Sequence, residues 1–130
     1  RFRSAGHHLG LSYQIRDDAL DLWGGQAIGK AHATDVRNKK KTLPVVYALE
    51  QNGTPPAERL RELYRQPALS AEDIDEAIRL LEELQAREFC AREAKKYQAA
   101  ALAELETVAA VAQPLTDLKA IAAFLIDRDF

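Results

Sequence analysis

The sequence predicts an all-α protein, and three features of its 130 residues support this fold class. Apolar residues recur at spacings of three and four, as on one face of a helix, and no segment shows the strict alternation of a half-buried strand. Glycine and proline pairs divide the chain into separate helical segments. Ser70, followed three residues later by Asp73, has the form of a helix start.

The length of the chain corresponds to one domain with one hydrophobic core. Its formal net charge is −2, and its longest apolar runs fall far short of the ~20 residues of a membrane span. We therefore expect neither nucleic acid nor a membrane as a partner. A single cysteine, Cys90, cannot form an internal disulfide, which favours a reducing compartment.

Two helices are expected in the first half of the chain, on either side of a long loop. The first covers residues 4–23 and ends at Gly24-Gly25, because glycine tolerates the left-handed conformation common at helix ends. A loop of about 17 residues follows, and loops of this length are usually functional or disordered. The second helix starts after Thr42 as N-cap, with Pro44 in its first turn, and is stopped by the Asn-Gly and Pro-Pro pairs that follow.

The second half is expected to contain a short helix over residues 57–65, a long helix starting at Ser70 and a last amphipathic helix over residues 115–127. The long helix has apolar positions at spacings of three and four: Ile74, Ile78, Leu81 and Leu84. The alanine-rich stretch beyond it either continues this helix to about residue 111 or forms a second helix at an angle. Pro114 is expected to break it.

Three carboxylates crowd the end of the first predicted helix, in the stretch YQIRDDALD. Asp17 and Asp21 share one helical stripe with Gln14, and Asp18 sits one residue round from it. Like charges one turn apart destabilise a helix, and desolvating several anions together costs far more. A bound cation removes both penalties, and hard oxygen ligands without histidine or thiolate favour Mg²⁺. A solvated acidic helix face is the alternative interpretation.

Cations follow these acids in the sequence. Lys30 comes after a glycine, and Asp35 precedes the basic run RNKKK at residues 37–41. Carboxylates that hold Mg²⁺ beside lysines that hold anions indicate a diphosphate site, in which lysine serves as a point charge on a flexible stem. A nucleic-acid patch is the alternative for the basic run, but no aromatic residues are interleaved with it and the chain is acidic overall.

These residues resemble the second aspartate-rich motif of the trans-isoprenyl diphosphate synthases, the polyprenyl synthetase family. The family pattern F-Q-x-x-D-D-x-x-D, then G-K, then D-x-x-x-x-K-x-T-L-P is matched by Tyr13-Gln14, Asp17-Asp18, Asp21, Gly29-Lys30, Asp35, Lys40 and Thr42-Leu43-Pro44. The terminal FLIDRDF is similar too, so the resemblance covers essentially the whole chain. Two departures are Tyr13 in place of the usual phenylalanine and a shorter loop before Lys30 that lacks the Asp-Pro of the family.

The resemblance implies the C-terminal portion of an isoprenoid-synthase-type helical bundle, with residues 1–130 as the C-terminal part of one polyprenyl synthetase domain. The implied activity is the Mg²⁺-dependent condensation of an allylic diphosphate with isopentenyl diphosphate, in a cytoplasmic homodimer. The first aspartate-rich motif of the family does not occur in the chain, so we expect these residues alone to be inactive. The alternatives are a class I terpene cyclase, a non-catalytic partner subunit, or a helical interaction module with a solvated acidic face.

The resemblance also implies roles for individual residues. Asp17 would ligate a Mg²⁺ that bridges the allylic diphosphate, and Asp18 and Asp21 would position this metal and its waters. Gln14 would line the wall beside the allylic carbon. Lys30 and Lys40 would hold the diphosphate.

Overall fold

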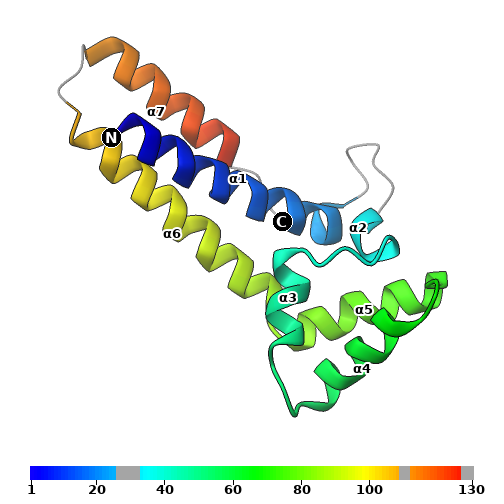
Figure 1. The fold of residues 1–130 in the computed structure, drawn as a ribbon. Coiled ribbons are helices and arrows are strands. Elements are labelled where there is room, and N and C mark those ends of the chain that lie inside the picture. Colours follow the sequence, from blue (N-terminus) through cyan, green and yellow to red (C-terminus); the bar gives the residue numbers. More distant parts are fainter. Residues whose placement is uncertain (26–32, 109–111, 127–130) are drawn as a thin grey trace. The chain divides into compact units, whose positions relative to one another are not determined.

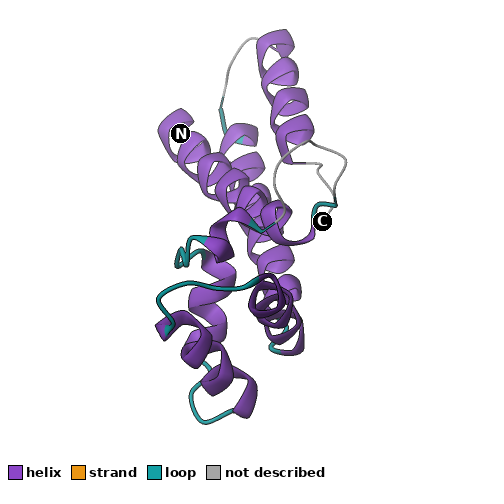
Figure 2. Ribbon diagram, turned by 90° about the vertical axis from the view of Figure 1, so that its right-hand side faces the viewer, coloured by secondary structure: helices purple, strands orange, loops and turns teal. Residues whose placement is uncertain are grey.

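The computed structural model describes residues 1–25, 33–108 and 112–126, and every regular element in these ranges is a helix (Figures 1 and 2). The predicted all-α fold class is therefore confirmed. The helices are α1 (Phe2–Trp23), α2 (Thr34–Arg37), α3 (Leu43–Leu49), α4 (Pro55–Arg65), α5 (Ala71–Glu83), α6 (Ala86–Glu106) and α7 (Ala112–Ile126). The chain divides into two compact units: unit 1 comprises Arg1–Asp17 and Ala91–Asp129, and unit 2 comprises chiefly Asp18–Cys90.

Helix α1 ends at the predicted position, and a steric limit fixes that end. The N–H of Gly24 donates to the carbonyl oxygen of Leu20 at 2.8 Å. A Cβ added at Gly24 would lie only 2.5 Å from the same oxygen, so the chain approaches the helix more closely here than any other residue allows. Gly25 follows with a φ of 69°, a left-handed conformation that glycine adopts without strain.

The predicted loop after α1 contains a short helix of its own. Helix α2 has four residues, too few for any apolar periodicity, so the sequence pattern could not reveal it. Ala33 and Lys39, on either side of it, are both left-handed, with φ of 54° and 52°. The N–H of Lys39 closes the turn by donating to Val36 at 2.8 Å. Thr42 then occupies the predicted N-cap position of α3, although its hydroxyl makes no capping hydrogen bond.

The pair Pro55-Pro56, predicted to stop a helix, begins one instead. Helix α4 starts at Pro55 with Thr54 as its N-cap. Proline is compatible with the first turn because the N–H groups there have no partner within the helix. The helix predicted over residues 57–65 is therefore longer at its start and ends where predicted.

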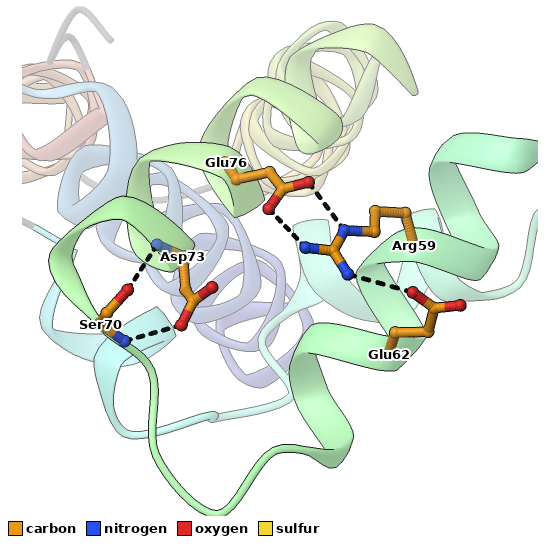
Figure 3. Close-up of polar contacts among 5 residues, drawn as sticks. All are labelled: Arg59, Glu62, Ser70, Asp73 and Glu76. Carbon is orange, nitrogen blue, oxygen red and sulfur yellow. Dashed lines mark hydrogen bonds and ion pairs between the residues drawn. The ribbon is translucent and has the colours of Figure 1, made fainter.

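The predicted start of α5 is confirmed in detail. The Oγ of Ser70 accepts a hydrogen bond from the N–H of Asp73 at 3.1 Å, and the Oδ2 of Asp73 accepts one from the N–H of Ser70 at 2.9 Å (Figure 3). Helix α4 packs against α5. Arg59 of α4 joins the two helices through a bidentate pair with Glu76, at 2.8 and 2.9 Å, and also contacts Glu62 at 3.1 Å.

The alanine-rich stretch forms a second helix, which settles the alternative that the sequence left open. Helix α5 stops at Glu83, Gln85 is left-handed with a φ of 59°, and α6 begins directly afterwards. Neither glycine nor proline marks this break. Pro114 does not end α6, which stops at Glu106; it lies in the first turn of α7, where proline is compatible with the helix.

The two units differ in their buried residues. Unit 2 has one core of aliphatic side chains: Leu22, Ala33, Val36, Val45, Ala48, Ala57, Leu60, Leu63, Ile74, Ala77, Leu81, Leu84 and Ala86. Unit 1 buries a smaller set, rich in alanine: Ala5, Ser12, Ile15, Ala94, Ala101, Leu105 and Ala122. In unit 1, the Oγ of Ser12 on α1 donates to the carbonyl oxygen of Ala94 on α6 at 2.8 Å.

Several large apolar side chains of unit 1 are exposed: Phe2, Tyr13, Leu118, Ile121 and Phe124. The last helix, predicted to be amphipathic, therefore buries only part of its apolar residues: Ala122 is covered, whereas Leu118 and Ile121 are exposed. Among the described residues, no helix combines the length and the apolar character needed to cross a membrane.

Candidate functional site

The last two turns of α1 carry the predicted acidic residues. Asp17, Asp18 and Asp21 are all half-buried, and Gln14, one turn earlier, is exposed. Asp17 is the last residue of the first segment of unit 1, whereas Asp18 and Asp21 belong to unit 2. The contacts that define a site are those made within unit 2.

Asp18 and Asp21 hold the backbone of residues 33–43, which we call the lysine segment. The Oδ2 of Asp21 accepts a hydrogen bond from the N–H of Asp35 at 3.0 Å, and its carbonyl oxygen accepts one from the N–H of Ala33 at 2.9 Å. The Oδ2 of Asp18 accepts from the N–H of Leu43 at 3.4 Å. The two carboxylates thus tie both ends of the lysine segment to the end of α1.

Lys40 is the lysine of this segment that faces the acids. Its Nζ lies 2.8 Å from the Oδ1 of Asp35, and its N–H donates to the carbonyl oxygen of Asp35 at 2.9 Å. The pKa of Lys40 is raised above its ordinary value, first by the hydrogen bond to Asp35 and then by the negative charges of Asp35, Asp21 and Asp18. The ammonium group is therefore fully charged at neutral pH, on a side chain that remains exposed.

The donor atoms at this end of α1 fit Mg²⁺ by their chemistry. They are carboxylate oxygens, and Mg²⁺ usually takes one or two such ligands and completes its shell with water and substrate phosphate. No three His, Cys, Asp or Glu side chains converge as a closed cage anywhere in the described ranges. Asp18 and Asp21 together fit the open type of site, in which the substrate supplies further ligands. Lys30, the other predicted diphosphate ligand, lies outside the described residues.

Sequence reasoning missed one residue of this site, Tyr64, and the pairing of another, Asp35. Asp35 was recognised as part of the motif, but its role as the partner of both Lys40 and Asp21 was not predicted. Tyr64 of α4 donates from its Oη to the carbonyl oxygen of Lys40 at 3.4 Å. Burial, and then the charge of Asp35, raise the pKa of Tyr64 well above its usual value, so it stays a neutral donor. No sequence pattern links Tyr64 to Lys40, because the two residues meet only through the packing of α4.

Comparisons with known proteins show the family to which the chain belongs. Residues 1–81 match the polyprenyl synthetase family model. The chain is 27% identical over 127 residues to a (2E,6E)-farnesyl diphosphate synthase of Mycobacterium bovis, a match that covers 95% of this chain and 35% of that protein. The chain thus spans about a third of the length of this relative.

Two solved structures are similar to the whole fold. The crystal structure of a polyprenyl synthetase from Streptomyces coelicolor A3(2) has a TM-score of 0.86 and 34% identity, over 95% of this chain and 38% of that one. A geranylgeranyl pyrophosphate synthase from Corynebacterium glutamicum, complexed with isoprenyl diphosphate and magnesium, has a TM-score of 0.84 and 26% identity, over 97% of this chain and 36% of that one.

Proposed function

Since the chain belongs to the polyprenyl synthetase family, we propose that it forms part of an enzyme that condenses an allylic diphosphate with isopentenyl diphosphate into a longer trans-prenyl diphosphate. The observation that carries this proposal is the joining of Asp18, Asp21 and Lys40 through one short segment. Acids that suit a divalent cation and a lysine that suits an anion occur there side by side. This combination fits a diphosphate better than it fits a solvated acidic face.

The chain's own residues contribute mainly through charge. When the bond between the allylic carbon and the diphosphate oxygen breaks, the electron pair leaves with the diphosphate and negative charge grows on it. The ammonium of Lys40 stabilises that charge more strongly in the transition state than in the bound substrate, which is what accelerates a reaction. The chemistry that Mg²⁺ supplies when bound is further electrostatic stabilisation of the same leaving group.

We assign the acids to the metal and the other polar residues to the substrate. Asp17, Asp18 and Asp21 are the proposed metal ligands, since carboxylates cannot hold an anion directly. Lys40, with Lys30, is proposed to bind the diphosphate, and Gln14 to line the wall beside the allylic carbon. Asp35 is proposed as a positioning residue, because it fixes Lys40 and donates its own N–H to Asp21.

The test is a set of variants of the protein that carries this chain, assayed with Mg²⁺, isopentenyl diphosphate and an allylic diphosphate. Asp17→Ala is expected to lower kcat about a hundredfold or more, as loss of one group that stabilises transition-state charge commonly does. Lys40→Ala is expected mainly to raise the KM for the allylic substrate, by about tenfold for one charge-assisted hydrogen bond. Asp75→Ala, which removes an exposed acid of α5, is the matched control and leaves both constants unchanged.

The products separate this proposal from its alternatives. A longer prenyl diphosphate supports it, whereas a cyclised hydrocarbon would assign the chain to a terpene cyclase. If no product forms and Mg²⁺ fails to promote binding of a bisphosphonate, the acids are a solvated face and the proposal is wrong. The homodimer and the cytoplasmic location implied by the resemblance remain predictions, the first of which analytical ultracentrifugation of the intact protein checks.

A further inference from the structure

Unit 2 contains a cavity of about 540 Å³ that is open to solvent and has a strongly basic lining. Lys39 and Lys41 of the lysine segment and Arg61 and Arg65 of α4 contribute four cations to it. The net charge of the whole chain is −2, so this concentration of positive charge is local. The volume is in the range of about 300–1,000 Å³ that is typical of ligand clefts. We call it the basic cavity.

Two of the four cations are held in place by the protein. The Nζ of Lys39 donates to the carbonyl oxygen of Gln66 at 2.6 Å. The guanidinium of Arg61 donates to the Oδ1 of Asn52 at 2.6 Å, to the last carbonyl of α3 and to the carboxylate of Glu58. Arg61 therefore ties the end of α3 to α4, and Glu58 offsets its charge.

The other two cations, Lys41 and Arg65, are exposed. Within the described residues, neither side chain has a hydrogen bond or a carboxylate in ion-pair contact. One comes from the lysine segment and the other from α4, so the two charges flank the cavity on different elements. Like charges gathered in a concave site raise the local positive potential and favour an anion there.

The basic cavity has a different set of cations from the acidic site at the end of α1, although Tyr64 contacts both, since it lines the cavity and donates to the carbonyl oxygen of Lys40. Lys40, which lies between the two cavity lysines in sequence, pairs with Asp35 instead. The backbone of Lys39 is left-handed, and the side chains of the neighbouring residues Lys39 and Lys40 lie at different sites. Tyr64 also lines the cavity, and because its phenol stays protonated it adds no negative charge.

We propose that the basic cavity binds a soluble diphosphate, independently of the acidic residues of α1 and of any metal held there. A diphosphate has two phosphoryl groups, so it can contact Lys41 and Arg65 together, and arginine pairs with phosphate oxygens in a bidentate manner. Leu49 and the ring of Tyr64 give the cavity an apolar wall, which admits an organic group attached to the diphosphate. The inference does not depend on prenyl transfer.

The test is isothermal titration calorimetry of the protein with pyrophosphate, and separately with ADP, in buffer containing EDTA. The chelator removes divalent cations and so prevents metal-dependent binding at the acids of α1. Lys41→Gln and Arg65→Gln are each expected to weaken binding about tenfold, as loss of a charge-assisted hydrogen bond does. Lys41→Arg keeps the charge and retains binding. Arg79→Gln, which removes an exposed cation of α5 outside the cavity, is the matched control.

Each outcome decides the proposal. The proposal is supported if either probe binds and its binding depends on Lys41 and Arg65 but not on Arg79. Tighter binding of pyrophosphate indicates an inorganic diphosphate as the ligand, and tighter binding of ADP indicates an organic one. If Lys40→Gln abolishes the binding and the cavity variants do not, the anion sits at the acidic site and the proposal is wrong. It is equally wrong if neither probe binds, or if Arg79→Gln weakens binding as much as the cavity variants. Circular dichroism of each variant establishes that it is folded.

Discussion

Unit 2 and unit 1 both consist of α-helices in the described residues, but they bury different side chains. Unit 2 packs leucine, isoleucine and valine into a closed core and joins its helices with side-chain pairs such as Arg59–Glu76. Unit 1 buries chiefly alanine and leaves large apolar side chains such as Phe124, 77% exposed, in contact with solvent. Contiguous exposed apolar surface usually marks a site of interaction. Unit 2 thus contains the larger aliphatic core, whereas unit 1 exposes large apolar side chains.

The largest loss of stability is expected from a void created in the unit 2 core. Leu63→Ala removes a fully buried side chain of α4 and is expected to lower the free energy of unfolding by about 3 kcal/mol, from lost transfer energy and the void left behind. Urea unfolding followed by fluorescence measures this loss. Trp23, the only tryptophan of the chain, packs against that core and therefore reports on unit 2.

The matched change in unit 1 is Phe124→Ala. It removes a larger side chain, but one that is already in water, so the unfolding free energy is expected to change by no more than about 0.5 kcal/mol. Binding of a hydrophobic dye to the folded protein should fall at the same time. A loss of stability comparable to that of Leu63→Ala would show that unit 1 is covered at this position in solution.

A smaller effect is expected at the start of α5. Ser70→Ala removes the hydroxyl that accepts from Asp73, and an N-cap substitution of this kind costs about 1 kcal/mol. The same fluorescence transition measures it. Ser70→Asp retains an acceptor at the N-cap and serves as the control, with most of the stability kept. If both variants lose equally, the hydroxyl contributes through something other than the cap.

A weaker contribution still is expected from the pair between α4 and α5. Arg59 and Glu76 are partly exposed, so solvent screens their attraction even though the contact is bidentate. In a double-mutant cycle with Arg59→Gln and Glu76→Gln, the coupling should be smaller than the loss caused by Ser70→Ala, and it should decrease as salt is added. Coupling that does not respond to salt would contradict this account.

The smallest expected effect on folding concerns Lys40. Its pKa is raised in the folded protein above the ordinary 10.5, so the stability that this shift contributes is fully present below that value and is lost as the pH rises through the folded pKa. NMR titration of the Lys40 side chain measures the shift directly. Asp35→Asn removes the largest cause and should return the pKa of Lys40 toward its ordinary value. An unchanged pKa in that variant would mean that Asp18 and Asp21 dominate instead.

Much of the fold was predictable because its signals are local. The capping residues of α5 lie three positions apart, and the end of α1 is marked by two glycines. Both helix boundaries could therefore be predicted from residues within a single turn. The break before Gln85 was not predictable, because a left-handed glutamine has no sequence signature and is held there by the surrounding structure. The start of α4 at Pro55 was misjudged because proline disrupts helix interiors yet suits first turns.

The candidate site was predictable in its residue types but not in its pairings. The motif drew attention to the acids and to Lys40, because charge clusters are visible in one dimension. Lys39 and Lys41 line the basic cavity whereas Lys40 pairs with Asp35, and this difference depends on the left-handed backbone of Lys39 and on the packing of α4. Tyr64, which contacts the carbonyl of Lys40, is brought there by tertiary structure alone.

The close approach of Gly24 to Leu20 also bears on how freely the sequence can vary. In a saturation-mutagenesis library, every substitution at position 24 would have to displace the backbone at the end of α1, only three residues beyond Asp21. Gly10 of the same helix is the opposite case, because an added Cβ there meets nothing within 4 Å. Alanine at position 10 should be enriched under selection for stability, since it favours a helix over glycine by about 0.5–1 kcal/mol. Helix α1 thus contains a glycine whose replacement by alanine should stabilise it, and is followed by a glycine that no other residue can replace without a backbone shift.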